Sequence, residues 1–304
     1  MKTRMSRRSA IGKMAPGTAA ASACAGIAHR TEAAEAGIQS GLKGRMHHSV
    51  CRWCYRNMPL EDLCRASRSM GLESVELLEP EEFPVLKGHG LTCAMAGFPT
   101  GKTPQGAIVG GIPSAFNRIE HHDTLCSVYE TRIPQCADAG LERLICFSGN
   151  REGLDDERGM ENCAVGLKRI LPLAEKHRIT LCMELLNSKV DHADYMCDRT
   201  AWGVELVKRI ASEYFKLLYD IYHMQIMEGD VIATIREHHP CIAHYHTGGV
   251  PGRGEIDETQ ELYYPAIMRA IVETGFKGFV AQEFVPKRPD KLASLKQGIQ
   301  ICDV

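Results

Sequence analysis

Four apolar runs, each carrying side chains that can bind a metal at or near its carboxyl end, constrain this chain more than any other feature. Thr180–Asn187 (TLCMELLN) is short and apolar and carries Glu184 near its end. Such a run is typical of a strand buried on both faces of a parallel sheet. The three later runs are Tyr214–Met224 with Asp220 and His223, Cys241–Gly249 with His244 and His246, and Gly278–Pro286 with Glu283. The carboxyl ends of parallel strands share one edge, so the pattern predicts a polar site at that edge.

Strand-like and helix-like patterns alternate along the remainder of the chain. The other expected strands are Arg45–Tyr55, Leu72–Leu78, Leu91–Gly97 and Leu144–Ser148, and the expected helices are Pro59–Met70, Glu81–Lys87, Ser114–Ala139, Asp156–His177, Trp202–Ser212, Asp230–His238 and Tyr264–Thr274. Ser114 would cap the third of these helices. Eight strands alternating with helices predict an α/β fold, a (β/α)8 TIM barrel that forms a single domain over residues 37–304. The Gly- and Pro-rich stretch Phe98–Pro113 is expected to be a lid or a substrate wall.

Residues 1–36 have a different composition from the barrel. Ser6–Lys13 contains Arg7 and Arg8, an Ala-rich stretch follows, and small residues surround Glu35. This order is typical of a twin-arginine export signal and predicts a periplasmic protein. The alternative is a disordered tail on a cytoplasmic protein, and a lipobox ending at Cys24 is less favoured because Ala21 replaces a larger aliphatic residue. No run approaches the roughly 20 apolar residues of a membrane span, so none is expected.

Net charge limits the class of partner, and domain size indicates the state of the cysteines. The net charge is −2, so a basic surface for nucleic acid is not expected and the partner is predicted to be a small molecule. The chain has 13 cysteines, but a domain of this size can bury a core without disulfides. Cys93, Cys146, Cys182 and Cys241 lie in expected strands, and we expect them to be reduced packing residues.

Several motifs imitate sites of other kinds. Ala96–Thr103 (AGFPTGKT) matches a phosphate-binding loop, but Pro104 and Gly106 follow where the required helix would begin. Cys51 and Cys54 form a C-x-x-C with no second pair, which favours packing over zinc. The adjacent histidines at positions 47–48, 121–122 and 238–239 are interpreted as surface or core residues.

The four strand ends together offer a ligand set for a divalent cation. Glu184, Asp220, His246 and Glu283 would supply three carboxylates and one imidazole. A single acidic residue at a strand end is commonly a helix cap, but four on consecutive strands are hard to explain in that way. An oxygen-rich set with one nitrogen favours Mg²⁺ or Mn²⁺, with Co²⁺ as a further candidate, over structural zinc.

These residues also carry a family resemblance. The run ELLN at Glu184–Asn187, the D-x-x-H from Asp220, the H-x-H ending at His246 and the Pro-Gly-Arg-Gly-Glu-Ile run containing Arg253 resemble the xylose-isomerase-like TIM barrels. The resemblance runs from about residue 45 to the C-terminus and is closest to the hydroxypyruvate isomerase branch. It implies that Glu184, Asp220, His246 and Glu283 bind the metal and that Glu184 and Glu283 are also the catalytic acid and base. It further implies that His223, Arg253 and Asn187 bind substrate, and Trp53 would form a wall of the pocket.

The implied chemistry is proton transfer next to a polarised carbonyl. A cation that binds both oxygens of an α-hydroxy carbonyl acidifies the neighbouring C–H and stabilises an enediolate. Hydroxypyruvate would give tartronate semialdehyde, with Arg253 or Arg52 pairing its carboxylate, although Arg52 is slightly favoured as a structural ion pair. The resembling hydroxypyruvate isomerases carry Gln where His246 stands, whereas the keto-sugar 3-epimerases carry His.

Other functions remain open. A sugar or inositol-derivative epimerase or isomerase of the same superfamily, acting in carbohydrate metabolism, is the first alternative. An endonuclease-IV-like DNA repair enzyme is more remote, because it needs histidines where Ala96, Gly97, Phe147 and Ser148 stand. A non-catalytic binding protein is disfavoured by the complete ligand set. A homo-oligomer is one expectation for a barrel of this kind.

Overall fold

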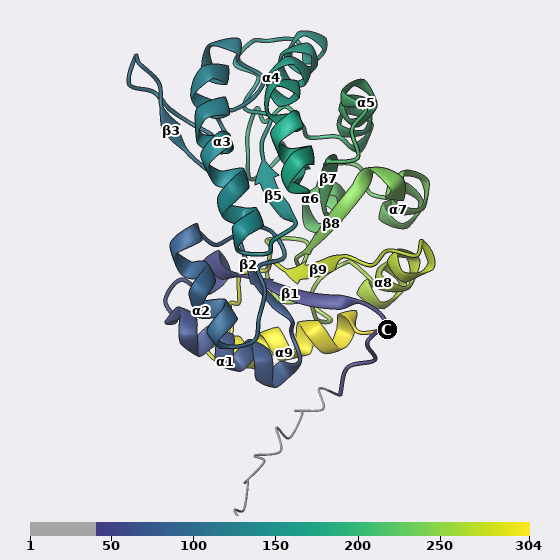
Figure 1. Cartoon of the computed structure of the whole chain (residues 1–304). Coiled ribbons are helices and arrows are strands. Elements are labelled where there is room, and N and C mark those ends of the chain that lie inside the picture. The colour runs from purple at the N-terminus through teal and green to yellow at the C-terminus, as the bar shows by residue number, and fades with distance from the viewer. Residues whose placement is uncertain (1–40) are drawn as a thin grey trace, which may run out of the picture. The chain divides into compact units, whose positions relative to one another are not determined.

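A computed structural model describes residues 41–304 (Figure 1). Its central feature is a seven-stranded sheet in the order β2-β1-β9-β8-β7-β6-β5, in which every neighbouring pair is parallel. The strands are β1 (His47–Cys51), β2 (Ser74–Glu76), β5 (Arg143–Cys146), β6 (Thr180–Glu184), β7 (Phe215–Asp220), β8 (Ile242–Thr247) and β9 (Phe279–Gln282). The predicted export signal lies outside the described residues and stays a prediction.

Helices cover the outer surface of this sheet (Figure 1). The α-helices are α1 (Leu60–Met70), α2 (Phe83–Gly88), α3 (His122–Asp138), α4 (Asp156–His177), α5 (Thr200–Ile210), α6 (Ile221–Met227), α7 (Val231–His238), α8 (Tyr264–Glu273) and α9 (Lys291–Cys302). Short 3-10 turns cover Arg52–Tyr55, Pro80–Glu82, Ile119–His121 and His239–Cys241. Among residues 41–304, none of these helices combines the length and the apolar character that crossing a membrane requires.

The eighth position of the barrel is filled by an irregular segment. Residues 92–96 make isolated parallel bridges to both edges of the sheet, at Ser74 and Leu78 on one side and at Leu144 on the other. The Ala96 amide donates to Arg143 O at 3.0 Å, and the Leu77 amide donates to Met95 O at 2.8 Å. The predicted strand Leu91–Gly97 therefore occupies its expected place but is not a regular strand. The (β/α)8 TIM barrel predicted from the sequence is confirmed.

The core explains why the strand sequences are apolar. Leu181, Leu217 and Leu218 are fully buried, and so are most side chains of the strands on either side. Burying each such side chain stabilises the fold by about 1.5–3 kcal/mol. Cys93, Cys146 and Cys182 are buried free thiols within this core, and Cys241 is a partly buried free thiol, as expected.

Helix α4 shows how local signals set an element. The Asp155 carboxylate accepts from the Arg158 amide at 2.9 Å and caps the start, and Arg178 adopts left-handed backbone at the end. These are the ordinary N-cap and C-cap devices. The expected bounds of this helix match the observed ones.

Three expected elements differ from the structure. Helix α3 begins at His122 and not at Ser114, because Phe116 is buried and the Asn117 amide donates to Ser148 O at 2.7 Å instead of to a helical neighbour. The run Tyr214–Met224 is strand only as far as Asp220, whose carboxylate caps helix α6. The expected strand Arg45–Tyr55 becomes a 3-10 turn after Cys51. Helices α6 and α9 were not anticipated.

The stretch Phe98–Pro113 contains a short hairpin. Strands β3 (Gly101–Lys102) and β4 (Ile108–Val109) pair antiparallel, and Figure 1 shows the hairpin projecting beside α3. The residues that imitate a phosphate-binding loop thus enter a hairpin rather than a helix, so the helix N-terminus that such a loop requires is missing.

Candidate metal centre and its cavity

The fold brings together the four residues expected to bind a metal. Glu184, Asp220, His246 and Glu283 each offer one ligand atom, and these atoms lie within 4.8 Å of one another. Their side chains are almost fully buried, with exposures between 0 and 4%. Glu184 ends β6, Asp220 ends β7, His246 lies near the end of β8, and Glu283 follows β9 directly. The parallel register pairs Asp220 with His246.

Hydrogen bonds and charge hold this cluster together. His246 Nδ1 lies 2.7 Å from Glu283 Oε2 and 3.2 Å from Glu184 Oε1. Arg253 Nη2 donates to Asp220 Oδ2 at 3.0 Å and to Glu283 Oε2 at 2.5 Å. The positive charge of Arg253 therefore offsets part of the negative charge of the three carboxylates.

The three carboxylates respond differently to this environment. Burial raises the pKa of Glu184, and the neighbouring Glu283 raises it further. Burial also raises the pKa of Asp220, to about 8, despite the opposing charge of Arg253. Burial would raise the pKa of Glu283 as well, but Arg253 and His246 outweigh it and hold that pKa well below its usual range. Crowded acids with divergent pKa values are typical of functional sites.

His223 adds a hydrogen-bond donor directed at the cluster. Asn187 Oδ1 accepts from the amides of Val190 and Asp191, which fixes the orientation of the Asn187 side chain. Asn187 Nδ2 therefore donates to His223 Nδ1 at 2.7 Å, so the proton of the neutral ring is on Nε2. His223 Nε2 is buried, has no hydrogen-bond partner among the described residues and lies 3.6 Å from Asp220 Oδ2.

These observations fit a divalent cation. Three carboxylates and one imidazole are the donors that Mg²⁺ or Mn²⁺ accepts, and His223 provides a donor for an oxygen bound nearby. Asn187 was expected to bind substrate, and the structure instead places both of its amide hydrogens on Asp191 and His223. Its predicted role stays a prediction.

The Pro-Gly-Arg run is built to place Arg253 above the cluster. Gly249 and Gly254 form a backbone bridge, and a Cβ on Gly249 would lie 2.4 Å from Glu255 O, so only glycine fits there. Arg253 itself has φ 52°, and its carbonyl accepts from the Val285 amide at 2.7 Å. Its guanidinium lies 5.1 Å from the Trp53 ring and 5.3 Å from the Tyr222 ring, distances at which cation–π attraction operates.

Trp53 and Arg56 line the cavity beside the cluster, whereas Arg52 does not. The Trp53 indole Nε1 donates to Glu283 Oε1 at 2.7 Å, so its ring is fixed beside the cluster. Arg52 instead donates to the backbone carbonyls of Tyr55 and Met58, so its role is structural but rests on backbone hydrogen bonds and not on the expected ion pair. Arg56, which sequence reasoning missed, lines the same cavity as Trp53.

Glu76 is the main residue of the site that sequence reasoning missed. It ends β2, is fully buried, and its Oε1 lies 2.8 Å from His244 Nε2 and 2.9 Å from His246 Nε2. Burial alone would raise the pKa of Glu76, but the two histidines lower it to about 2. The signal was a charged residue inside the otherwise apolar end of the run Leu72–Leu78.

The cluster opens into a cavity of about 410 Å³. Glu184, Glu283 and Arg253 form its polar floor. Its other lining residues are Trp53, Arg56, Leu77, Glu79, Gly97, Phe98, Ile112, Ile145, Phe147, Leu186 and His192. An apolar wall over a few convergent polar groups is the usual form of a small-molecule site.

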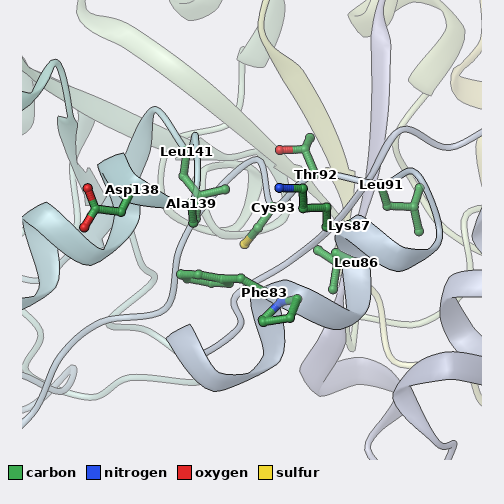
Figure 2. Close-up of a pocket in the computed structure, with 10 residues that line it drawn as sticks. Phe83, Leu86, Lys87, Leu91, Thr92, Cys93, Asp138, Ala139 and Leu141 are labelled. Carbon is green, nitrogen blue, oxygen red and sulfur yellow. The ribbon is translucent and has the colours of Figure 1, made fainter.

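A second cavity, of about 490 Å³, lies between α2 and the end of α3 (Figure 2). Phe83, Leu86, Leu91 and Cys93 give it a mainly apolar lining, and Lys87 and Asp138 are its charged residues. None of the candidate ligands lines it, so the chemistry belongs to the first cavity.

The fold and the site together define a parallel (β/α)8 barrel with a buried acidic cluster at the carboxyl ends of its strands. The family model of the xylose isomerase-like TIM barrel matches residues 65–302. The chain therefore belongs to the xylose isomerase-like TIM barrel family.

Individual relatives agree with this assignment. The chain is 27% identical over 242 residues to a Homo sapiens protein named "Putative hydroxypyruvate isomerase", covering 73% of this chain and 83% of that protein. It is 23% identical over 241 residues to the 2-oxo-tetronate isomerase of Pectobacterium atrosepticum, covering 77% and 89%.

Solved structures show the same fold. An AP endonuclease of family 2 from Brucella melitensis superposes with a TM-score of 0.72 at 24% identity, covering 84% of this chain and 97% of that one. The D-psicose 3-epimerase of Clostridium cellulolyticum H10, solved with D-tagatose, gives a TM-score of 0.62 at 17% identity, covering 83% and 90%. Identities this low support the fold alone.

Proposed function

We propose that this protein is a metal-dependent isomerase that converts hydroxypyruvate to tartronate semialdehyde. The observation that carries the proposal is the pair of buried glutamates, Glu184 and Glu283, which flank His246 and both reach the cavity. Relatives named for hydroxypyruvate and 2-oxo-tetronate isomerisation support a small α-hydroxy carbonyl acid as the substrate.

Glu184, Asp220, His246 and Glu283 would hold the cation. When bound, a divalent cation polarises the substrate carbonyl and acidifies the neighbouring C–H. The positive charge of the cation would also offset the mutual repulsion of the three carboxylates. The proton transfers are carried out by side chains of the protein.

The two glutamates are suited to opposite tasks. Arg253 and His246 favour the ionised form of Glu283, so Glu283 is positioned to accept the proton from C3 of hydroxypyruvate. Burial favours the protonated form of Glu184, so Glu184 can deliver a proton to C2. Transfer of the hydroxyl proton from O3 to O2 completes the isomerisation without any net gain or loss of atoms.

The neighbouring residues would bind the ends of the substrate. His223 Nε2–H is free to donate to a substrate oxygen, and the guanidiniums of Arg253 and Arg56 can pair a carboxylate. Trp53, Phe98 and Phe147 surround the reacting carbons with apolar surface and keep water from the enediolate.

A keto-sugar epimerase is the second candidate. His246 is the observation that favours it, because the resembling 3-epimerases carry histidine at this position, and a cavity of about 410 Å³ has room for more than hydroxypyruvate. Opposed glutamates can also return a proton to the carbon from which it came. An endonuclease-like function has less support, since Gly97 and Phe147 stand in the cavity wall where histidines would be needed.

Proton–deuterium exchange tests both candidates. The purified protein is incubated with Mg²⁺ in D2O with hydroxypyruvate, a four-carbon 2-oxo acid and a panel of ketohexoses, and the products are followed by NMR. Metal-dependent deuterium incorporation and conversion of hydroxypyruvate support the isomerase. Exchange at C3 of a ketose with inversion supports the epimerase, and no exchange with any compound contradicts both.

A further inference from the structure

Glu76 reaches the metal centre from the half of the barrel that provides no ligand. It is the last residue of β2 and lies beside Cys51 in the register of β1, so its side chain is held in the barrel interior. It is fully buried, as are His244 and His246. A lone buried carboxylate is costly unless donors satisfy it.

Two imidazoles supply those donors. Glu76 Oε1 lies 2.8 Å from His244 Nε2 and 2.9 Å from His246 Nε2, both ordinary N–H···O distances. An ionised carboxylate only accepts hydrogen bonds, so both Nε2 atoms carry protons. The rings of His244 and His246 stand edge to face, at 84° with centroids 5.1 Å apart.

The hydrogen bond to Glu76 determines which ring nitrogen of His246 is directed at the acidic cluster. With Nε2–H committed to Glu76, Nδ1 is the nitrogen that faces Glu283 at 2.7 Å and Glu184 at 3.2 Å. A metal ligand must present a bare nitrogen, and a carboxylate on the opposite ring nitrogen both fixes the proton and orients the ring.

We propose that Glu76 is a positioning residue that holds His246 with its proton on Nε2 and its Nδ1 directed at the cation. His244 serves as the second donor that keeps the Glu76 carboxylate in place. The inference rests on the metal site of the proposed function, but it concerns residues that would not contact substrate. Because Glu76 acts through His246, its loss should weaken cation binding before any reaction takes place.

The first test locates the ring protons of His246 in the wild-type protein. The full-length protein is labelled with ¹⁵N-histidine, and two-bond ¹⁵N–¹H correlations locate the ring protons of His246 with and without Mg²⁺, using His246→Gln to assign its signals. We expect a proton on Nε2 in both samples. A bare Nε2 with a protonated Nδ1 in the Mg²⁺ sample would overturn the proposal.

The second test measures cation affinity. Free Mn²⁺ is followed by electron paramagnetic resonance during titration of the wild type, Glu76→Gln and the matched control Asp303→Asn. Asp303 is also a buried carboxylate beside a histidine, since its Oδ1 lies 3.7 Å from His48 Nε2, but it has no contact with the cluster. We expect Glu76→Gln to weaken Mn²⁺ binding by about 10- to 100-fold and Asp303→Asn to leave it unchanged.

Two outcomes of the titration would reject the role of Glu76. Wild-type Mn²⁺ affinity in folded Glu76→Gln would show that the bond does not orient His246. Two ions per wild-type chain, with only the weaker lost in Glu76→Gln, would make Glu76 a ligand of a second site formed with His244. If Glu76→Gln does not fold, the proton position in the wild type still decides. Absence of substrate turnover would count against the proposed function and not against this inference.

Discussion

The two halves of the barrel contribute differently to the site: the C-terminal half provides the candidate ligands, and the N-terminal half provides much of the cavity wall. In the C-terminal half, strands β6 to β9 all pair in parallel, with one register shift in β7 between Leu217 and Leu218, and each ends at or beside a residue of the acidic cluster. In the N-terminal half, β2 has three residues, residues 92–96 make only isolated bridges, and a hairpin follows. That half contributes Leu77, Phe98 and Phe147 to the cavity wall.

The difference shows where precision is needed. A cation site requires ligand atoms within a few tenths of an ångström of their places, and neighbouring strands that are hydrogen-bonded along their length supply that rigidity. A cavity wall requires only shape and apolar surface, which irregular backbone can provide. Glu76 and Trp53 are exceptions, because they come from the N-terminal half and contact the candidate ligands His246 and Glu283. The predictions below test this division.

The largest effect is expected for Glu283→Gln. This change removes a ligand, a proton acceptor and the partner of both Trp53 Nε1 and Arg253. We expect the isomerisation rate with Mg²⁺ to fall by about 10²- to 10⁴-fold, measured as initial rates on hydroxypyruvate. Glu79→Gln, which alters an acid on the N-terminal side of the cavity, should keep the rate within a few-fold. Equal losses in both variants would contradict the division.

Removal of the cation should come next. At a free Mn²⁺ concentration 100 times its Kd, binding stabilises the native state by about 2.7 kcal/mol, so chelation with EDTA should lower Tm. Asp220→Asn should lose this Mn²⁺-dependent shift, whereas Glu79→Gln should retain it. A Tm that does not respond to Mn²⁺ in the wild type would refute a cation bound by the C-terminal half.

Asn187→Ala tests the support behind the site. Without the Asn187 amide, His223 Nδ1 loses the donor that keeps the ring proton on Nε2, and the neutral ring can take either form. We expect kcat/KM to fall by about 10-fold, within the range usual for a residue that orients a side chain of the active site. Asn117→Ala removes a comparably buried amide, which donates to Asn150 O, and should lower Tm without changing kcat/KM. The reverse pattern would mean that Asn187 is only structural.

The smallest effect is expected for Glu255→Gln, which probes how the Arg253 loop is fastened. Burial opposes ionisation of Glu255, but the amides of Arg288 and Lys287 and the Ser294 hydroxyl donate to it and lower its pKa. A lowered folded-state pKa gives stability that is present above the unfolded value of about 4.3 and is lost as pH falls through the folded value.

Unfolding by urea at several pH values checks this expectation. At pH 7, Glu255→Gln should lower the free energy of unfolding by about 1–2 kcal/mol, as for loss of a hydrogen-bonded charge. The gap from wild type should begin to narrow as pH falls below about 4.3 and should close only below the lowered folded-state pKa of Glu255, where both proteins carry a neutral group. A gap that is constant from pH 7 to pH 3 would show that the Glu255 charge contributes nothing to stability.

The regular half of the molecule was predictable from local pattern. Apolar runs of strand length, each with one polar ligand near its end, indicated β6 to β9 and their order, and the caps of α4 set its bounds. Periodicity and the residues at element ends are local properties, so they can be read directly from the sequence. The irregular half was less predictable. Ala115 and Phe116 have sequences typical of a helix, but they lie outside α3 because their side chains are buried and the neighbouring backbone bonds to residues distant in sequence.

The sequence by itself determined the barrel and the identity of the four candidate ligands, and its Pro-Gly-Arg run singled out Arg253. Only the tertiary structure decided that Glu76 binds the imidazoles of His244 and His246, 168 and 170 residues away, that Asn187 is committed to His223, and that Arg56 faces the cavity where Arg52 does not. A strand pattern fixes which residues stand at the end of a sheet. The partner of each side chain depends on how the sheet curls to bring its distant strands together, and that curvature results from the packing of the whole chain.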